Sequence, residues 1–257
     1  MDLSTILGML LSVTSISIGD ILEGGSPLHV IHVSSLLIVI PTAIFSAMTS
    51  TNKKFIKPAF KELKIIFKGT GTDVPKLIKE LIDLSVTARR DGLLALEPKV
   101  ATIEDEFLKS AMMMLVDGQP IGDIRENMEI KIEQLEEYYH ECGHFWIKTG
   151  ESCPTFGLVG AVMGLMLALA LLDDPAAMAA GIAGAFTATV TGIMGAYAIF
   201  GPWGAKIMAN AKDIIRTKTV IVEAVTGIAE GANPRNLEER LFNFLSHDEP
   251  AQSQFNK

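Results

Sequence analysis

The stretch of sequence that decides the fold is PTFGLVGAVMGLMLALALL, residues 154–172, which carries no acidic or basic side chain. A helix needs about 20 residues to cross a hydrocarbon layer about 30 Å thick, so this stretch is long enough to span a membrane. A second stretch, AAMAAGIAGAFTATVTGIMGAYAIFGPW at residues 176–203, has the same character. Both are rich in Gly, Ala and Thr, which allow close helix packing and place hydroxyl groups inside the bilayer.

Two apolar runs near the N-terminus complete a set of four predicted spans, at residues 3–18, 28–48, 153–172 and 176–203. No basic segment precedes the first run, so we expect it to be retained rather than cleaved as a signal peptide. The sequence therefore predicts an all-α membrane protein with four transmembrane helices. A helical cytoplasmic domain is expected between the second and third spans, and a cytoplasmic tail after the fourth.

Outside the spans, apolar residues recur three and four positions apart, which predicts helices. The predicted helices cover residues 55–67, 74–90, 103–116, 121–146, 207–229 and 237–245. The polar end of the chain, residues 246–257, is expected to be disordered. The chain then divides into residues 1–49 with two spans, 50–150 with the cytoplasmic helical domain, 151–206 with two spans, and 207–257 with the C-terminal helices and tail.

Basic residues flank the spans on one side only. They follow the second span, precede the third and follow the fourth, as Lys53, Lys54, Lys57, Lys61, Lys64, Lys68, Lys148, Lys206, Lys212, Arg216 and Lys218. The two short loops hold Asp20, Glu23, Asp173 and Asp174 and no basic residue. Cytoplasmic loops carry the excess of Lys and Arg, so both termini and the middle segment are predicted to be cytoplasmic.

The overall charge points away from nucleic acid as a partner. The formal net charge is −8, and no basic patch is interleaved with aromatic residues. The lysines beside the spans fit the anionic headgroups of the lipid bilayer instead. Two cysteines, Cys142 and Cys153, do not make a disulfide framework.

Four short motifs occur in order along the chain. They are ARRDGLLALE at residues 88–97, PTFGLVGAVMG at 154–164, Gly201-Pro202, and Gly231 followed by Asn233-Pro234-Arg235. With the layout of two spans, a cytoplasmic block, two spans and a tail, the chain resembles the MotA/PomA family of flagellar motor stator subunits, and is close to its epsilonproteobacterial members.

The resemblance implies a subunit that is not an enzyme and has no cofactor other than the coupling protons. Five copies would form a homopentamer around a dimer of MotB in a 5:2 complex in the bacterial inner membrane. A membrane aspartate of MotB would take up and release the ion, and the ring would turn to drive the rotor protein FliG. Spans three and four contain no carboxylate of their own, which agrees with a proton relay that uses a partner's acid.

The resemblance also implies an ion path along the last two spans. Thr189 is in the family's polar position, where its hydroxyl would face the MotB carboxylate and could donate or accept a hydrogen bond. Phe186 lies one turn earlier and would flank the same site, and Thr155 begins the third span. Pro154 and Pro202 bracket the cytoplasmic ends of the two helices, where a missing backbone donor permits a hinge.

Two further implications concern the ion and the rotor. Sodium-driven members usually carry Thr where this chain has Ala161. Alanine lacks the hydroxyl oxygen that could bind sodium, which favours protons as the coupling ion. Arg89 and Glu97 are in the family's charged rotor-facing positions, with Arg90 as a further candidate. Complementary charges there would steer and register FliG more than hold it tightly.

Several alternatives remain open from the residues alone. His140-Glu141-Cys142-Gly143-His144 matches the H-E-x-x-H pattern of zinc peptidases, so an intramembrane zinc protease is one alternative, although no third ligand is evident and the motif also fits a solvated helix face. An ExbB/TolQ-type energiser is a second alternative, with three spans in a different order. Thr189 could instead serve an ordinary helix hydrogen bond, and Arg89 could pair with Glu97.

Overall fold

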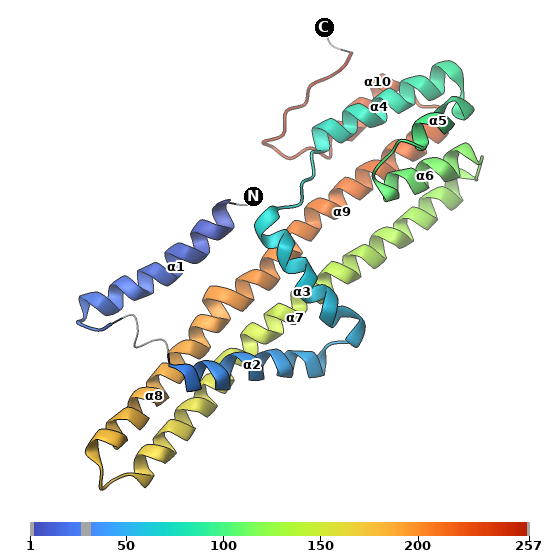
Figure 1. Cartoon of the computed structure of the whole chain (residues 1–257). Coiled ribbons are helices and arrows are strands. Elements are labelled where there is room, and N and C mark those ends of the chain that lie inside the picture. Colours follow the sequence, from blue (N-terminus) through green and yellow to red (C-terminus); the bar gives the residue numbers. More distant parts are fainter. Residues whose placement is uncertain (1–2, 27–31, 256–257) are drawn as a thin grey trace. The chain divides into compact units, whose positions relative to one another are not determined.

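The protein was analysed as a computed structural model, which describes residues 3–26 and 32–255. All regular elements in these residues are helical (Figure 1). They are α1 (Leu3–Leu22), α2 (Val33–Ser50), α3 (Lys53–Lys68), α4 (Val74–Asp91), η2 (Leu93–Leu96), α5 (Glu97–Val100), α6 (Glu106–Val116), α7 (Ile121–Ala170), α8 (Pro175–Met194), η3 (Gly195–Phe200), α9 (Gly201–Ala229) and α10 (Pro234–Phe242).

Four helical stretches of the described chain are long and apolar enough to cross a membrane: α1, α2, the C-terminal part of α7, and the continuous stretch that begins with α8. The predicted all-α fold with four candidate spans is therefore confirmed. The first helix begins at Leu3 as predicted and extends beyond residue 18 to Leu22, whereas the second runs from Val33 to Ser50. Residues 28–31 of the predicted second span lie outside the described part of the chain.

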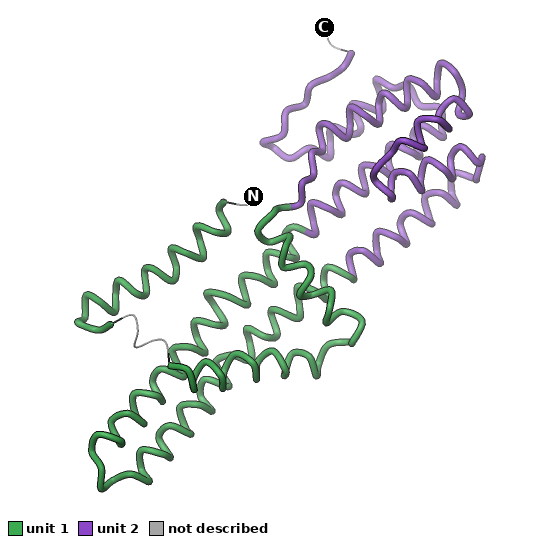
Figure 2. The backbone as a smooth tube through the Cα atoms, in the orientation of Figure 1, with its two compact units in different colours: residues 1–69, 138–210 green, residues 70–137, 211–257 purple. Residues whose placement is uncertain are grey.

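The chain forms two compact units, each built from two separate stretches of sequence (Figure 2). The first unit contains residues 1–69 and 138–210, and the second contains residues 70–137 and 211–257. Helix α3 thus belongs with the apolar helices, because its own apolar side packs on them. The four-part division expected from the sequence follows the chain order and stays a prediction.

Glycines bring the backbones of α7 and α8 together in the first unit. A Cβ atom added to Gly157 would lie 2.9 Å from the carbonyl oxygen of Ala188, and one added to Gly164 would lie 2.9 Å from that of Gly181. A Cβ added to Gly192 would lie 2.7 Å from the carbonyl oxygen of Cys153. Small residues at such a crossing are what permits van der Waals packing between helices in a bilayer.

Helix α3 is amphipathic and lies with its apolar side against α7 and α9. Phe55, Ala59 and Ile66 are buried, whereas its six lysines are exposed. The indole nitrogen of Trp146 donates to the carbonyl oxygen of Ala59 at 2.9 Å, and the side-chain amide of Asn210 donates to that of Ile65 at 3.0 Å. A basic face on a helix that directly follows a span is typical of the membrane surface.

The second unit has its own apolar core, made by α4, α6 and α10 with segments of α7 and α9. Asp105 caps α6 by accepting the backbone N–H groups of Phe107 and Leu108 at 2.9 and 3.0 Å, and Lys218 of α9 lies 2.5 Å from its other oxygen. Burial raises the pKa of Asp105, but the hydrogen bonds from Lys218 and the backbone outweigh it and hold this pKa below its ordinary value. The charged carboxylate therefore joins α6 to α9.

The C-terminal segment differs from its expected disorder. Residues 246–255 contain no helix or strand, yet Ser253 and the backbone N–H of Gln254 donate to the buried carboxylate of Glu238 at 2.5 and 2.9 Å. The side chain of Gln254 also donates to the carbonyl oxygen of Lys79 at 3.1 Å. Polar composition alone does not reveal these contacts with α4 and α10.

Candidate functional site

Helix α8 has one side packed on its neighbours and one side exposed. Its buried residues Gly181, Ala185, Ala188, Thr191 and Gly192 recur at helical spacing. The opposite side carries large apolar groups in the open, namely Phe186, Val190, Ile193 and, in the next segment, Tyr197. In the described part of the chain, these residues form the exposed side of α8 and of the segment that follows it.

Thr189 and Phe186 lie next to that open side, one turn apart as the sequence predicted. The hydroxyl of Thr189 donates to the carbonyl oxygen of Ala185 at 3.2 Å, while Phe186 is 70% exposed. A hydroxyl that donates within its own helix keeps its lone pairs as acceptors for a second group. Thr189 is half-buried, so it can be reached from the exposed side of α8.

Thr155 and Ala161 occupy different sides of α7. Thr155 is exposed, whereas Ala161 is half-buried. No hydrogen bond joins Thr155 to Thr189 within the described residues. A single chain therefore does not link the two predicted ion-path hydroxyls.

Pro154 and Pro202 line the same hollow. It has a volume of about 580 Å³ and lies between α7 and the junction of η3 with α9. Its other lining residues are Ile147, Gly150, Glu151, Ala196, Tyr197, Gly201 and Ala205. Glu151 is the only side chain in this set that carries a charge, and it is exposed.

The helix widens where it meets Pro202. Residues Gly195–Phe200 are π-helical, and the backbone N–H of Gly201 bonds the carbonyl oxygen of Ala196, five residues earlier. Proline lacks a backbone N–H, and in a regular α-helix its ring clashes with the carbonyl four residues earlier, here that of Ala198. A π-turn relieves this clash, and such turns often occur at functional sites.

Pro154, in contrast, does not break its helix. The predicted helix 121–146 and the third span form one continuous helix, α7, with Pro154 inside it. The sequence could suggest a junction there because proline usually ends or kinks a helix. The hinge expected at both prolines stays a prediction.

The predicted rotor-facing residues lie in the second unit and are solvent-exposed. Arg89 is in the last turn of α4 and Glu97 begins α5, with Gly92 at a positive φ of 86° ending α4 between them. Neither Arg89 nor Glu97 forms an ion pair within the described residues. Arg90 instead pairs with its neighbour Asp91 at 2.7 Å, and its hydrogen bond holds the pKa of Asp91 below the ordinary value.

Over residues 3–26 and 32–255, the H-E-x-x-H motif is not part of a cluster that could hold a metal. The rings of His140 and His144 stack with centroids 5.6 Å apart on α7, as their spacing requires. No cluster of three or more His, Cys, Asp or Glu side chains able to hold a metal occurs in the described residues. The third ligand that a catalytic zinc site needs is thus missing from this part of the chain.

Two features of the site escaped sequence reasoning. Tyr197 is 78% exposed and lines the hollow beside the two prolines. In the sequence, an aromatic residue within an apolar run cannot be distinguished from a residue that faces lipid. Tyr197 is distinguished only by its position in the π-helical segment, which the structure shows. The richness in glycine predicts close packing in general terms, but the contact between Gly157 and Gly192, which lie on different helices, follows no simple sequence motif.

Comparisons with known proteins agree on one family. Residues 99–219 match the MotA/TolQ/ExbB proton channel family. The chain is 56% identical over 255 residues to Motility protein A of Helicobacter pylori, covering 99% of each chain. It is also similar to a chain in the structure of C. jejuni MotAB, with a TM-score of 0.96, 67% identity, and coverage of 99% of this chain and 100% of that chain. A chain in the flagellar MotAB stator complex from Bacillus subtilis matches with a TM-score of 0.86 and 30% identity over 94% of this chain and 95% of that one.

Proposed function

Because the chain belongs to the MotA/TolQ/ExbB proton channel family, we propose that it is the MotA-type subunit of a flagellar stator, which couples proton flow across the inner membrane to torque on the rotor protein FliG. The similarity over 99% of the chain to Motility protein A carries this proposal. The ExbB/TolQ-type alternative is less favoured because four candidate spans occur and the full-length similarity is to MotA-type proteins.

The chain works together with a MotB-like partner that supplies the acid. Residues 155–172 and 176–201 hold no carboxylate, and a proton relay within a bilayer requires an ionisable group. The open side of α8 offers the hydroxyl of Thr189, which accepts from the acid when the acid is protonated and turns from Ala185 to donate when the acid is charged, and Phe186 as an apolar neighbour. The partner's aspartate then lies against this side, in a ring of five subunits around two partners.

Protons are the coupling ion in this proposal. Ala161 contributes a methyl group where an oxygen would serve sodium. Moving one charge across 100 mV releases about 2.3 kcal/mol. That energy changes an equilibrium constant roughly 50-fold, since each 1.4 kcal/mol is a factor of ten. One proton therefore suffices to bias each step of rotation.

The prolines connect the ion path to motion. Pro154 and Pro202 share one hollow with Glu151, and each removes a backbone hydrogen bond at the proposed cytoplasmic end of its span. Protonation of the partner's acid favours one arrangement of these helix ends over the other. Both termini and the second unit lie in the cytoplasm, in agreement with the basic residues that flank the spans.

Proton flux into vesicles tests this function. Vesicles that contain the chain together with its partner, without any segment of the partner that blocks the path, should acidify internally under an inward proton gradient. Vesicles with the chain alone, or with the partner's membrane aspartate replaced by Asn, should stay at the background rate. Flux through the chain alone would contradict the proposal, and flux that requires sodium would contradict the choice of ion.

Charge reversal tests the rotor surface. We expect Arg89→Glu and Glu97→Lys each to lower swimming speed severalfold, because complementary charges at an interface set its registration and like charges repel. Both side chains are exposed and unpaired in the described residues, so stability should change by less than about 0.5 kcal/mol. Glu126→Lys, an exposed charge on α7, is the matched control. Normal swimming by both variants would show that the surface around Arg89 and Glu97 is not the one that contacts the rotor.

A further inference from the structure

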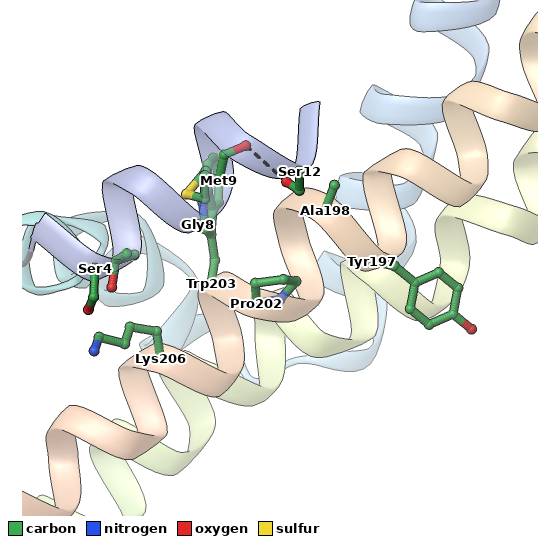
Figure 3. Close-up of a pocket in the computed structure, with 10 residues that line it drawn as sticks. Ser4, Gly8, Met9, Ser12, Tyr197, Ala198, Pro202, Trp203 and Lys206 are labelled. Atoms are coloured by element: carbon green, nitrogen blue, oxygen red, sulfur yellow. Dashed lines mark hydrogen bonds between the residues drawn. The ribbon is translucent and has the colours of Figure 1, made fainter. Parts of the chain in front are cut away.

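Large apolar side chains are exposed in both compact units, but the four runs predicted as membrane spans, residues 3–18, 28–48, 153–172 and 176–203, all lie in the first unit. An exposed apolar side chain of the first unit can therefore face lipid or a partner within the membrane. Tyr197, for example, points outward beside the pocket between α1 and the start of α9 (Figure 3). In the second unit an exposed apolar side chain faces water unless another protein covers it.

Leu94 has the largest exposed fraction among the large apolar side chains described in the second unit, 73%. It belongs to the 3₁₀ helix η2, which consists of Leu93, Leu94, Ala95 and Leu96. Leu96 is fully buried, and Leu93 packs against the core of the unit. Side chains three residues apart in a 3₁₀ helix lie on the same side, so Leu93 and Leu96 share the inner side and Leu94 is turned away from it.

The backbone on both sides of Leu94 holds this orientation. Gly92 ends α4 at a positive φ of 86°, and its carbonyl oxygen accepts the N–H of Ala95 at 3.2 Å. The carbonyl oxygen of Leu94 itself accepts the N–H of Glu97. The turn cannot rotate to bury Leu94 without exposing the two leucines that it places in the core. A side chain that is already held in position loses less conformational entropy on binding.

Exposed charged side chains border Leu94 along the chain. Glu97 lies three residues after it, which places both on one side of the turn, and Arg89 lies in the last turn of the preceding helix. An apolar centre with a polar rim is the usual composition of a protein–protein interface. The arrangement therefore fits a partner surface with an apolar hollow, an acidic group that faces Arg89 and a basic group that faces Glu97.

The apolar part of such a contact contributes more to affinity than the charged part. Full burial of a leucine side chain strengthens binding roughly 10- to 150-fold, which is about 1.5–3 kcal/mol at 1.4 kcal/mol per factor of ten. An exposed ion pair strengthens it by up to about fivefold, or about 1 kcal/mol on the same scale. In this contact Leu94 holds the partner, whereas Arg89 and Glu97 set its registration.

We propose that Leu94 is the apolar anchor of the rotor-facing surface and that it enters an apolar hollow of the rotor protein. The proposal rests on the proposed stator function, which places Arg89 and Glu97 at the rotor, and it assigns most of the binding energy to the leucine between them. In a ring whose subunits meet head to tail, this surface does not face a copy of itself. A different surface of a neighbouring copy is the competing occupant.

Photo-cross-linking in intact cells identifies what covers Leu94. Leu94 is replaced by a benzophenone-bearing phenylalanine, and the same probe at Ile130, which is exposed on α7 in the same unit, is the control. Position 94 should give a product with the mass of the chain joined to the rotor protein, in higher yield than position 130. A product with a second copy of the chain only, equal yields from the two positions, or no product from position 94 would each overturn the proposal.

Truncation of the side chain measures its contribution. Leu94→Ala should weaken binding to the rotor protein roughly 10- to 150-fold and so lower swimming speed severalfold. Leu94→Met keeps an apolar side chain of similar volume and should restore most of the speed. Ile130→Ala removes the same number of carbon atoms from an exposed side chain and should swim normally.

Proton flux separates the anchor from the stator function. Vesicles that hold the chain and its partner contain no rotor protein, so flux should be the same with Leu94→Ala as with the unchanged chain. Normal swimming by Leu94→Ala would overturn the anchor. A parallel loss of flux would overturn it too, because Leu94 would then act on the fold or the ion path. Absence of flux from the unchanged complex would contradict the stator function itself, and the anchor with it.

Discussion

Cells that carry Thr189→Val should lose swimming completely, with an unchanged amount of the protein in the membrane. Valine keeps the shape of threonine and removes only the hydroxyl. The hydrogen bond that this hydroxyl donates, to the carbonyl oxygen of Ala185, runs along its own helix. Loss of this bond does not leave the carbonyl oxygen of Ala185 without a partner, because a carbonyl in the middle of a helix also accepts a backbone N–H. The helix should therefore form and insert as before.

The expected loss arises from the partner's acid. When that acid is charged, the hydroxyl of Thr189 turns from the carbonyl oxygen of Ala185 and donates to the carboxylate instead, and a hydrogen bond to a charged group contributes about 1.5–3 kcal/mol. Without it, proton uptake and release beside α8 should slow by roughly 10- to 150-fold, because each 1.4 kcal/mol is a factor of ten. Thr189→Ser, which restores the hydroxyl, should swim. Speed in a soft-agar and tethered-cell assay, with membrane abundance measured in parallel, gives the readout.

Thr187→Val is the matched control for this experiment. Two residues along a helix correspond to about 200° of rotation, so Thr187 projects from the other side of α8 from Thr189. Its hydroxyl donates to the carbonyl oxygen of Ala183 at 2.9 Å, within its own helix as well. We expect near-normal swimming. Normal swimming by Thr189→Val, or equal loss in both variants, would remove Thr189 from the ion path.

The sequence predicts the membrane-spanning part of the fold well, for a physical reason. A bilayer allows only segments that satisfy their own backbone hydrogen bonds, so an uncharged run of about 20 residues is nearly sufficient to predict a helix. The family resemblance then points to Thr189, Phe186 and the two prolines, whose roles stay predictions. In the structure the two prolines line one hollow. A local sequence pattern cannot predict that two segments so far apart in the chain meet there.

What the sequence could not predict depends on contacts between distant segments. The two compact units each combine stretches more than 60 residues apart, because α7 and α9 each contribute to both. The π-turn before Pro202 replaces the simple break that proline suggests. The C-terminal segment is held by the buried carboxylate of Glu238, a contact invisible in a run of polar residues.

Replacing Gly192 tests the packing on which the whole ion path rests, and we expect Gly192→Leu to abolish both assembly and swimming. The atoms nearest to a Cβ at this position are the carbonyl oxygen of Cys153 at 2.7 Å, Cα of Gly157 at 3.1 Å and Cα of Pro154 at 3.2 Å. All three belong to the backbone of α7, so no side chain can rotate away and the helices must separate. Even Gly192→Ala should lower stability by about 1–3 kcal/mol, the usual cost of overpacking.

Gly184→Ala, in the same helix, isolates this effect from helix propensity. Its Cβ would meet the ring of His32 at 3.5 Å, an ordinary van der Waals distance. Alanine favours a helix over glycine by up to about 1 kcal/mol, so this variant should be neutral or more stable. Thermal unfolding of the detergent-purified complex compares the two alanine variants directly. If Gly192→Ala unfolds at the same temperature as Gly184→Ala, then α7 and α8 do not cross on their glycines. The open side of α8 would then no longer be fixed by that crossing, and Thr189 would lose the geometric basis for facing a partner's acid.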